Sequence, residues 1–74
     1  MLTTREAAAV VRELRTGRGW NQAELASAAG VSRSFIADLE RGKPTLEAAK
    51  LFDVLQALGY EVAIRELATG ELRW

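Results

Sequence analysis

Residues 21–43 constrain the fold of this chain more than any other stretch, because they carry the signals of two short helices joined by one sharp turn. Asn21 and Glu24 have the spacing of a capping box, in which each side chain bonds the other residue's backbone N–H at the start of a helix. Gly30 ends that helix, since glycine readily adopts the left-handed backbone conformation of a tight turn. Ser32 then caps a second helix, whose inner face is apolar and whose outer face is polar.

Two more helices are predicted around this unit. Thr3 and Glu6 form another capping box, and the residues that follow have the spacing of one buried helical face: Ala7, Val10, Val11 and Leu14. Thr45 is expected to cap a fourth helix that runs to about Leu58. These patterns predict a mainly α-helical bundle of four helices.

A change of pattern follows the fourth helix. Tyr60, Val62 and Ile64 alternate with other residues, which predicts one β-strand over residues 60–67. We expect no second strand in the chain to pair with it. Its backbone groups must then remain in water or bond to another molecule, and pairing with a second copy across a two-fold axis is the simplest arrangement.

The 74 residues are enough for one domain. We divide the chain into a helical part at residues 1–59, the strand at 60–67 and a C-terminal tail at 68–74. The tail is expected to be mobile. Its last residue, Trp74, either frays or inserts into a pocket of its own chain or of a partner, and insertion is the favoured alternative.

The fourth helix carries more apolar residues than the surface helix of a monomer needs. Ala48, Phe52 and Leu55 form one stripe, and a second stripe is a candidate for contact between subunits. The alternative is that a small domain simply surrounds its last helix. The predicted interface of a homodimer combines the second stripe with the strand: Leu51, Val54, Leu58, Tyr60, Val62 and Ile64.

Composition excludes several kinds of chemistry. The chain contains no Cys and no His, which excludes disulfides, thiolate or imidazole metal sites and Ser/His or Cys/His catalytic pairs. No paired carboxylates or glycine-rich phosphate loop stand out, so we expect neither an enzyme nor a cofactor. No segment approaches the length of a membrane span and the N-terminus is unlike a signal peptide, so we expect a cytoplasmic protein without a membrane partner.

Charge is balanced overall but uneven along the chain. The ten basic and ten acidic residues give no net charge, which argues against non-specific coating of a polyanion. Residues 1–20 hold four arginines and two glutamates, whereas residues 45–74 hold three basic and five acidic side chains. One basic face turned toward phosphates would explain this distribution, and scatter in so small a sample explains it equally well.

The polar face of the helix after Ser32 suits the edges of DNA bases. Arg33 can bond guanine O6 and N7 together, while Ser32 and Ser34 are small polar groups at the helix start. Asp38 lies one turn further along the same face. It would either accept a hydrogen bond from a cytosine amine or orient Arg33 or Arg41 through a salt bridge, and the salt bridge is the favoured role. We predict base contacts from four residues: Ser32, Arg33, Ser34 and Asp38.

A second group of residues suits the DNA backbone. Gln22 opens a helix, where its amide groups and the positive end of the helix can meet a phosphate. Arg41 and Lys43 follow the next helix and can bind phosphate as well. Arg15 and Glu40 lie beside inward-facing apolar positions, so an ion pair between two helices is plausible, and a phosphate contact from Arg15 is the less favoured alternative.

Residues 8–58 resemble the Cro/CI-type, or XRE, family of helix-turn-helix regulators. The resemblance rests on two motifs, Asn21-Gln-Ala-Glu-Leu-Ala26 and Leu39-Glu-Arg-Gly-Lys43. It implies a bundle of mostly five helices that binds double-stranded DNA as a dimer and represses at palindromic operators. It also implies the base and phosphate contacts named above, and it supports a buried pairing of Arg15 with Glu40.

After Gly59 the chain departs from that family, because a strand is predicted where many members have a fifth helix. Four helices, a terminal strand and a tail that ends in Trp resemble the HipB-like antitoxins of HipA-type kinase toxins. This implies paired strands over a dimer that represses its own operon and binds the toxin. The alternatives are a stand-alone regulator without a toxin and an adaptor that has lost DNA binding, which the zero net charge favours.

Overall fold

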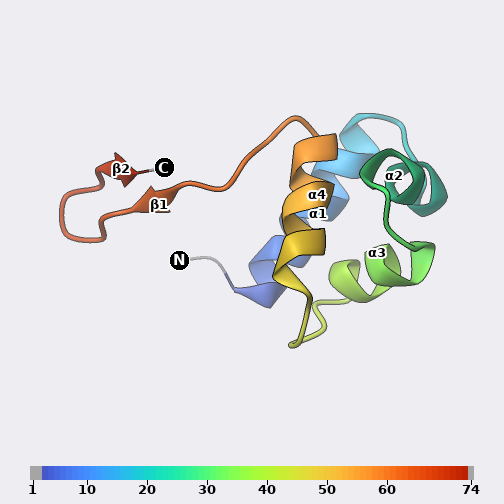
Figure 1. Cartoon of the computed structure of the whole chain (residues 1–74), viewed down its shortest axis with the longest axis horizontal. Helices are drawn as coiled ribbons and strands as arrows, with labels where there is room; N and C mark the ends of the chain where they lie inside the picture. Colours follow the sequence, from blue (N-terminus) through green and yellow to red (C-terminus); the bar gives the residue numbers. More distant parts are fainter. Residues whose placement is uncertain (1–2, 74) are drawn as a thin grey trace.

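The computed structural model describes residues 3–73 as four helices followed by a small hairpin (Figure 1). The helices α2 and α3 pack against each other, α4 covers α2, and α1 packs on α3. The prediction of a mainly helical, four-helix bundle is confirmed, whereas Trp74 lies outside the described residues. The elements are α1 (Thr4–Gly17), α2 (Gln22–Ala29), α3 (Arg33–Glu40), α4 (Ala48–Ala57), β1 (Ile64–Arg65) and β2 (Leu72–Arg73).

The helix starts are held by the side chains that the sequence predicts. The Thr3 hydroxyl accepts from the Glu6 backbone N–H at 3.1 Å, and the Glu6 carboxylate accepts from the Thr3 N–H at 3.0 Å. Asn21 and Glu24 repeat this reciprocal pair at 2.8 and 2.9 Å. Each box satisfies two backbone donors that have no partner inside the helix, so both predicted capping boxes are confirmed.

The turn between α2 and α3 also follows the prediction. Gly30 caps α2 with a φ of +71°, the left-handed region in which a side chain would be strained. Ser32 begins α3, and its hydroxyl accepts from the Phe35 N–H at 3.0 Å. One residue, Val31, separates these two caps, so α3 must leave the turn in a direction different from that of α2.

The core draws at least one large side chain from every helix. The fully buried ones are Val11 of α1, Leu25 of α2, Ile36 and Leu39 of α3, Val54 of α4 and Leu58 at its end. Two of them correct the predicted dimer interface, because Val54 is 0% and Leu58 is 1% exposed. These side chains pack inside one subunit and cannot contact a second. The alternative in which the small domain surrounds its last helix is therefore the right one for Val54 and Leu58, whereas Leu51 of the same stripe is only half-buried.

The helix α4 begins later than predicted. Its N-cap is Glu47, without a side-chain hydrogen bond, and Thr45 caps nothing. Leu46, between Thr45 and this N-cap, is half-buried against the core. The missing cap leaves the start of α4 dependent on tertiary contacts.

The C-terminal segment differs from the prediction of one strand over residues 60–67. Only Ile64 and Arg65 are strand, and they pair antiparallel with Arg73 and Leu72 of the same chain. The tail therefore supplies the second strand and is not an unstructured end. Gly70, with a φ of +75°, allows the chain to reverse, an arrangement that alternation in a single segment does not reveal.

The hairpin extends away from the helical bundle at the end of an extended linker (Figure 1). Its apolar side chains are open to solvent, with Ile64 71%, Leu67 78% and Leu72 57% exposed. An isolated two-stranded hairpin is marginally stable in water, so this one needs a further surface to pack on. Separately, none of the helices within residues 3–73 has both the length and the apolarity to cross a bilayer.

The end of α4 is fastened by an arginine. Arg18 Nη2 donates to the Leu58 carbonyl at 3.0 Å, and its guanidinium lies 5.1 Å from the centre of the Trp20 ring. Gly59 follows with a φ of +89°, and a Cβ there would lie 3.1 Å from Arg18 Nη2. This position therefore combines a left-handed backbone with a close neighbour.

Gly59→Ala is expected to lower the free energy of unfolding by about 1–2 kcal/mol, because a left-handed backbone penalises a side chain and the Arg18 contact must shift. Chemical denaturation followed by circular dichroism measures the loss. Gly17→Ala is the matched control, since Gly17 lies in α1 with open space around its Cβ position. We expect it to leave stability unchanged or raise it by up to about 1 kcal/mol. Equal losses in both variants would contradict this account of Gly59.

Candidate DNA-binding surface

The start of α3 presents its polar side chains to solvent. Ser32, Arg33 and Ser34 are all exposed, while Ile36 and Leu39 of the same helix are buried. Within residues 3–73, Arg33 has no carboxylate in ion-pair distance. An unpaired arginine at the exposed start of a short helix can reach the base edges of a DNA groove.

Arg33 and Gln22 lie on the same hollow of the surface. The hollow runs between the starts of α2 and α3 and is lined by Arg15, Asn21, Gln22, Ala23 and Arg33. The fold thus brings the predicted base contact of α3 beside the predicted phosphate contact of α2, although eleven positions separate them in the sequence. One molecule lying across the hollow can meet both side chains.

A partly buried ion pair joins α1 to α3 beside this surface. Arg15 Nε donates to Glu40 Oε2 at 2.6 Å, and Arg15 Nη2 donates to Glu40 Oε1 at 3.0 Å. The side chains are 12% and 5% exposed, so the pair is shielded from most of the solvent. The hydrogen bond that Arg15 donates to the Glu40 carboxylate raises the pKa of Arg15 above its ordinary value, against the effect of burial, which lowers it. The predicted ion pair between these residues is confirmed.

The same pair also orients residues around the turn. Arg15 Nη1 donates to the Trp20 carbonyl at 2.8 Å, which fixes the chain just before α2. Gln22 Nε2 donates to Glu40 Oε1 at 3.2 Å. Glu40 therefore orients the side chain of Gln22 as well as that of Arg15.

The corner after α3 contains its own counterion. Asp38 forms ion pairs with Arg41 and, at 3.5 Å, with Lys43. Asp38 therefore steers Arg41, one of the two arginines considered for that role, and it does not pair with Arg33. Its base contact remains a prediction, as do the phosphate contacts of Arg41 and Lys43. The carboxylate reduces the net positive charge that this corner offers to a phosphate.

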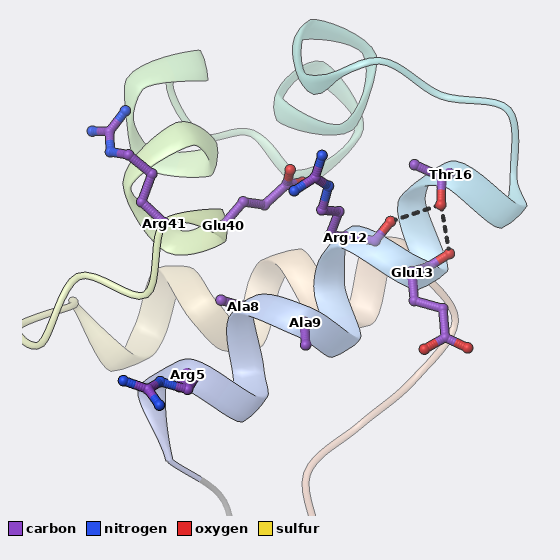
Figure 2. Close-up of a pocket in the computed structure, with 8 residues that line it drawn as sticks. All are labelled: Arg5, Ala8, Ala9, Arg12, Glu13, Thr16, Glu40 and Arg41. Carbon is purple, nitrogen blue, oxygen red and sulfur yellow. Dashed lines mark hydrogen bonds between the residues drawn. The ribbon is translucent and has the colours of Figure 1, made fainter.

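One arginine of the surface was missed by the sequence reasoning. Arg12 of α1 lines a hollow with Arg33 and Arg41, and Figure 2 shows its side chain reaching from α1 toward Glu40 at the end of α3. The signal was its spacing, because Arg12 lies three residues before Arg15 and therefore on the same side of a helix. In the sequence, Arg12 contributes only to the basic surplus of residues 1–20.

The remaining predicted interface residues surround an apolar groove elsewhere on the molecule. The groove lies between α1, α4 and the segment that follows α4, and it is lined by Ala7, Val10, Leu14, Leu51, Leu55, Tyr60, Glu61, Val62 and Ala63. Leu51, Tyr60 and Val62 thus meet at one place, whereas Ile64 lies further along on β1. Val10 is 43% exposed there, although helical spacing predicts it to be buried.

Comparison with known proteins places these features in a family. The family model described as Helix-turn-helix (HTH_3) matches residues 11–64. A curated relative, the uncharacterized HTH-type transcriptional regulator y4mF of Sinorhizobium fredii (strain NBRC 101917 / NGR234), is 46% identical over 71 residues. That match covers 96% of this chain and 91% of the relative.

Solved structures with the same fold include HipB proteins. A chain in "Structure of HipA-HipB-O2-O3 complex" and one in "HipB-O4 20mer complex" each superpose with a TM-score of 0.81 at 22% identity. Each match covers 90% of this chain and 94% of the other. At this identity the likeness concerns the fold, and the family follows from the sequence matches. The chain belongs to the XRE-type helix-turn-helix family of DNA-binding transcriptional regulators.

Proposed function

We propose that the protein is a homodimeric repressor that binds a palindromic operator through α3 and serves as the antitoxin of a HipA-like kinase toxin. The observation that carries DNA binding is the grouping of Arg33, Gln22 and Arg12 around adjoining hollows of one surface. Arg33 reads a base pair in the major groove. Gln22, at the positive end of α2, holds the backbone that flanks it.

Two features support a dimer. The hairpin carries exposed apolar side chains, and the bundle carries an apolar groove beside the linker to that hairpin. A second copy can cover both, because each copy brings the same hairpin and the same groove across a two-fold axis. The dimer then presents two α3 helices to two half-sites of a palindrome.

The fold supports the toxin partnership. HipB structures of the same architecture have been solved in a HipA-HipB-O2-O3 complex and with a 20mer. Repression of its own operon would couple the supply of antitoxin to the amount of toxin, since both genes are then read from one transcript. The toxin-free alternative of the same fold is a stand-alone regulator.

The first experiment uses the protein with two partners. Fluorescence anisotropy measures its binding to the DNA immediately upstream of its own reading frame, with an unrelated duplex of equal length as control. Co-purification tests a complex with the product of the adjoining reading frame. Tight binding to the upstream DNA and a stable complex with a kinase-like protein support the proposal. DNA binding without such a complex supports the stand-alone regulator, and a folded dimer that binds neither duplex at low salt supports the adaptor.

Arg33→Ala and Lys43→Ala should weaken DNA binding in different ways. Loss of Arg33 removes a base contact, so we expect about 1–3 kcal/mol less discrimination at one base pair of each half-site. Loss of Lys43 removes a phosphate contact, so binding to all sequences should fall together and the salt dependence should flatten by about one phosphate. Anisotropy titrations on the upstream DNA and on single-base variants separate the two outcomes. Equal, sequence-independent losses in both variants would remove Arg33 from base reading.

A further inference from the structure

We propose that Arg5 and Arg12 of α1 form a second phosphate-binding surface, the α1 arginine strip, which holds DNA backbone beyond the bases that α3 reads. This inference rests on the proposed DNA binding and deepens it. It assigns a contact to a helix that is neither the reading helix nor its partner in the turn. The strip makes the contacted length of DNA greater than the two α3 helices alone would give.

The two arginines of the strip line a shallow hollow on the face of α1 (Figure 2). Ala8 and Ala9 lie along the helix between the two arginines, so no large side chain separates them. The Thr16 hydroxyl is turned into its own helix, where it donates to the carbonyls of Arg12 or Glu13 at 3.0 and 3.1 Å. The hollow is lined by Arg5, Ala8, Ala9, Arg12, Glu13, Thr16, Glu40 and Arg41.

The strip is continuous with the candidate DNA-binding surface. Arg12, Glu40 and Arg41 line the hollow of the strip and also the neighbouring hollow that contains Arg33. A basic path therefore leads from Arg33 on α3 through Arg12 to Arg5 at the start of α1. A DNA duplex seated on α3 has to pass along one side of this path, where its backbone meets the arginines.

The charges of the strip are available to a ligand. Within residues 3–73, neither Arg5 nor Arg12 has a carboxylate in ion-pair distance. Glu40 is already neutralised by Arg15, which bonds both of its oxygens. Glu13 is the one acidic group of the hollow without an ion pair in the described residues, so the strip keeps a positive balance.

The spacing of the arginines favours a repeating polyanion. Arg5 and Arg12 are two helical turns apart, or about 10.5 Å along α1. Phosphates of one DNA strand follow one another about every 3.4 Å along the duplex axis, so the two guanidinium groups can bind different phosphates of one backbone. An acidic segment of a protein partner could also bind two arginines. DNA is favoured because the basic path extends from the strip to Arg33, the predicted base contact.

The test compares charge variants of the strip on two probes, the DNA upstream of the reading frame and an unrelated duplex of equal length. Arg5→Ala with Arg12→Ala should weaken binding to both probes about tenfold or more at physiological salt. The slope of log K against log salt should flatten by about one for each lost phosphate contact. Arg5→Lys with Arg12→Lys should retain most of the affinity, because lysine also binds phosphate. Glu13→Gln should tighten binding to both probes.

Lys50→Ala is the control, because Lys50 is exposed on α4 and lines neither the hollow of the strip nor the hollow that contains Arg33. It should leave the salt slope unchanged. A double alanine variant that folds, as circular dichroism reports, and still binds with the wild-type affinity and slope would overturn the inference while wild-type DNA binding stands. If the double variant instead loses only a protein partner, the strip is a protein-docking surface and the inference is wrong. Failure of the wild-type protein to bind either probe would refute the proposed function itself.

Discussion

Glu40→Ala is expected to lower the free energy of unfolding by up to about 3–5 kcal/mol, because it leaves the charged Arg15 guanidinium, only 12% exposed, without its carboxylate partner. A domain of this size has a stability on the order of 5–15 kcal/mol, so the loss is a large part of the total. Gln22 also loses its inner hydrogen bond to Glu40. Thermal and urea denaturation followed by circular dichroism measure the change.

The control for this prediction is an exposed ion pair of similar length. Lys50 Nζ lies 3.1 Å from Glu47 Oε2, and both side chains are about half exposed or more. Glu47→Ala should cost at most about 1 kcal/mol, because water and salt screen such a pair. Arg15→Met combined with Glu40→Leu removes both charges and should recover most of the stability lost in Glu40→Ala. Equal losses in Glu40→Ala and Glu47→Ala would show that burial does not strengthen the dependence on Glu40.

The sequence predicted those features that a few neighbouring residues determine. The capping boxes at Thr3 and Asn21 and the left-handed turn at Gly30 depend on side-chain chemistry within about one helical turn, and all three are present. The pairing of Arg15 with Glu40 spans 25 positions, yet it was predicted because both residues lie beside inward-facing positions in a motif with a known fold. The exposed start of α3 followed in the same way from the buried positions of Ile36 and Leu39.

The features that were missed depend on how elements meet in space. Both apolar stripes of α4 satisfy helical spacing, and only its crossing of α2 decides that Val54 and Leu58 face the core. The partner of β1 could not be predicted, because a two-residue strand at Leu72 and Arg73 carries no alternation of its own. Arg12 joins the surface of α3 only through the packing of α1 on α3. Periodicity identifies a face of one element but not the neighbour that covers it.

The change in strand pairing also changes what holds a dimer together. Because β1 already bonds to β2 of its own chain, its backbone does not need a strand from a second subunit. Two subunits can still join through the apolar side chains and the free edges of their hairpins. Ile64 is predicted for the interface, and at 71% it is more exposed than Leu72, the other apolar residue of the two strands. It lies just beyond the residues that line the apolar groove, which end at Ala63. A charge at Ile64 would therefore lie between the groove and the rest of the hairpin, the two surfaces that the proposed dimer contact combines.

Ile64→Asp should accordingly produce monomers and weaken binding to the upstream DNA by about 10²–10⁴-fold, because a monomer loses the second half-site and the gain from bivalent binding. Sedimentation equilibrium measures the mass, and anisotropy measures the affinity. The bundle itself should remain folded, since Ile64 is 71% exposed and contributes nothing to the core. Arg65→Ala, a change at the next residue of β1, should leave both mass and affinity unchanged. An Ile64→Asp protein that keeps a dimer's mass would place the joint elsewhere, whereas a monomer with undiminished affinity would mean that one α3 helix suffices for binding.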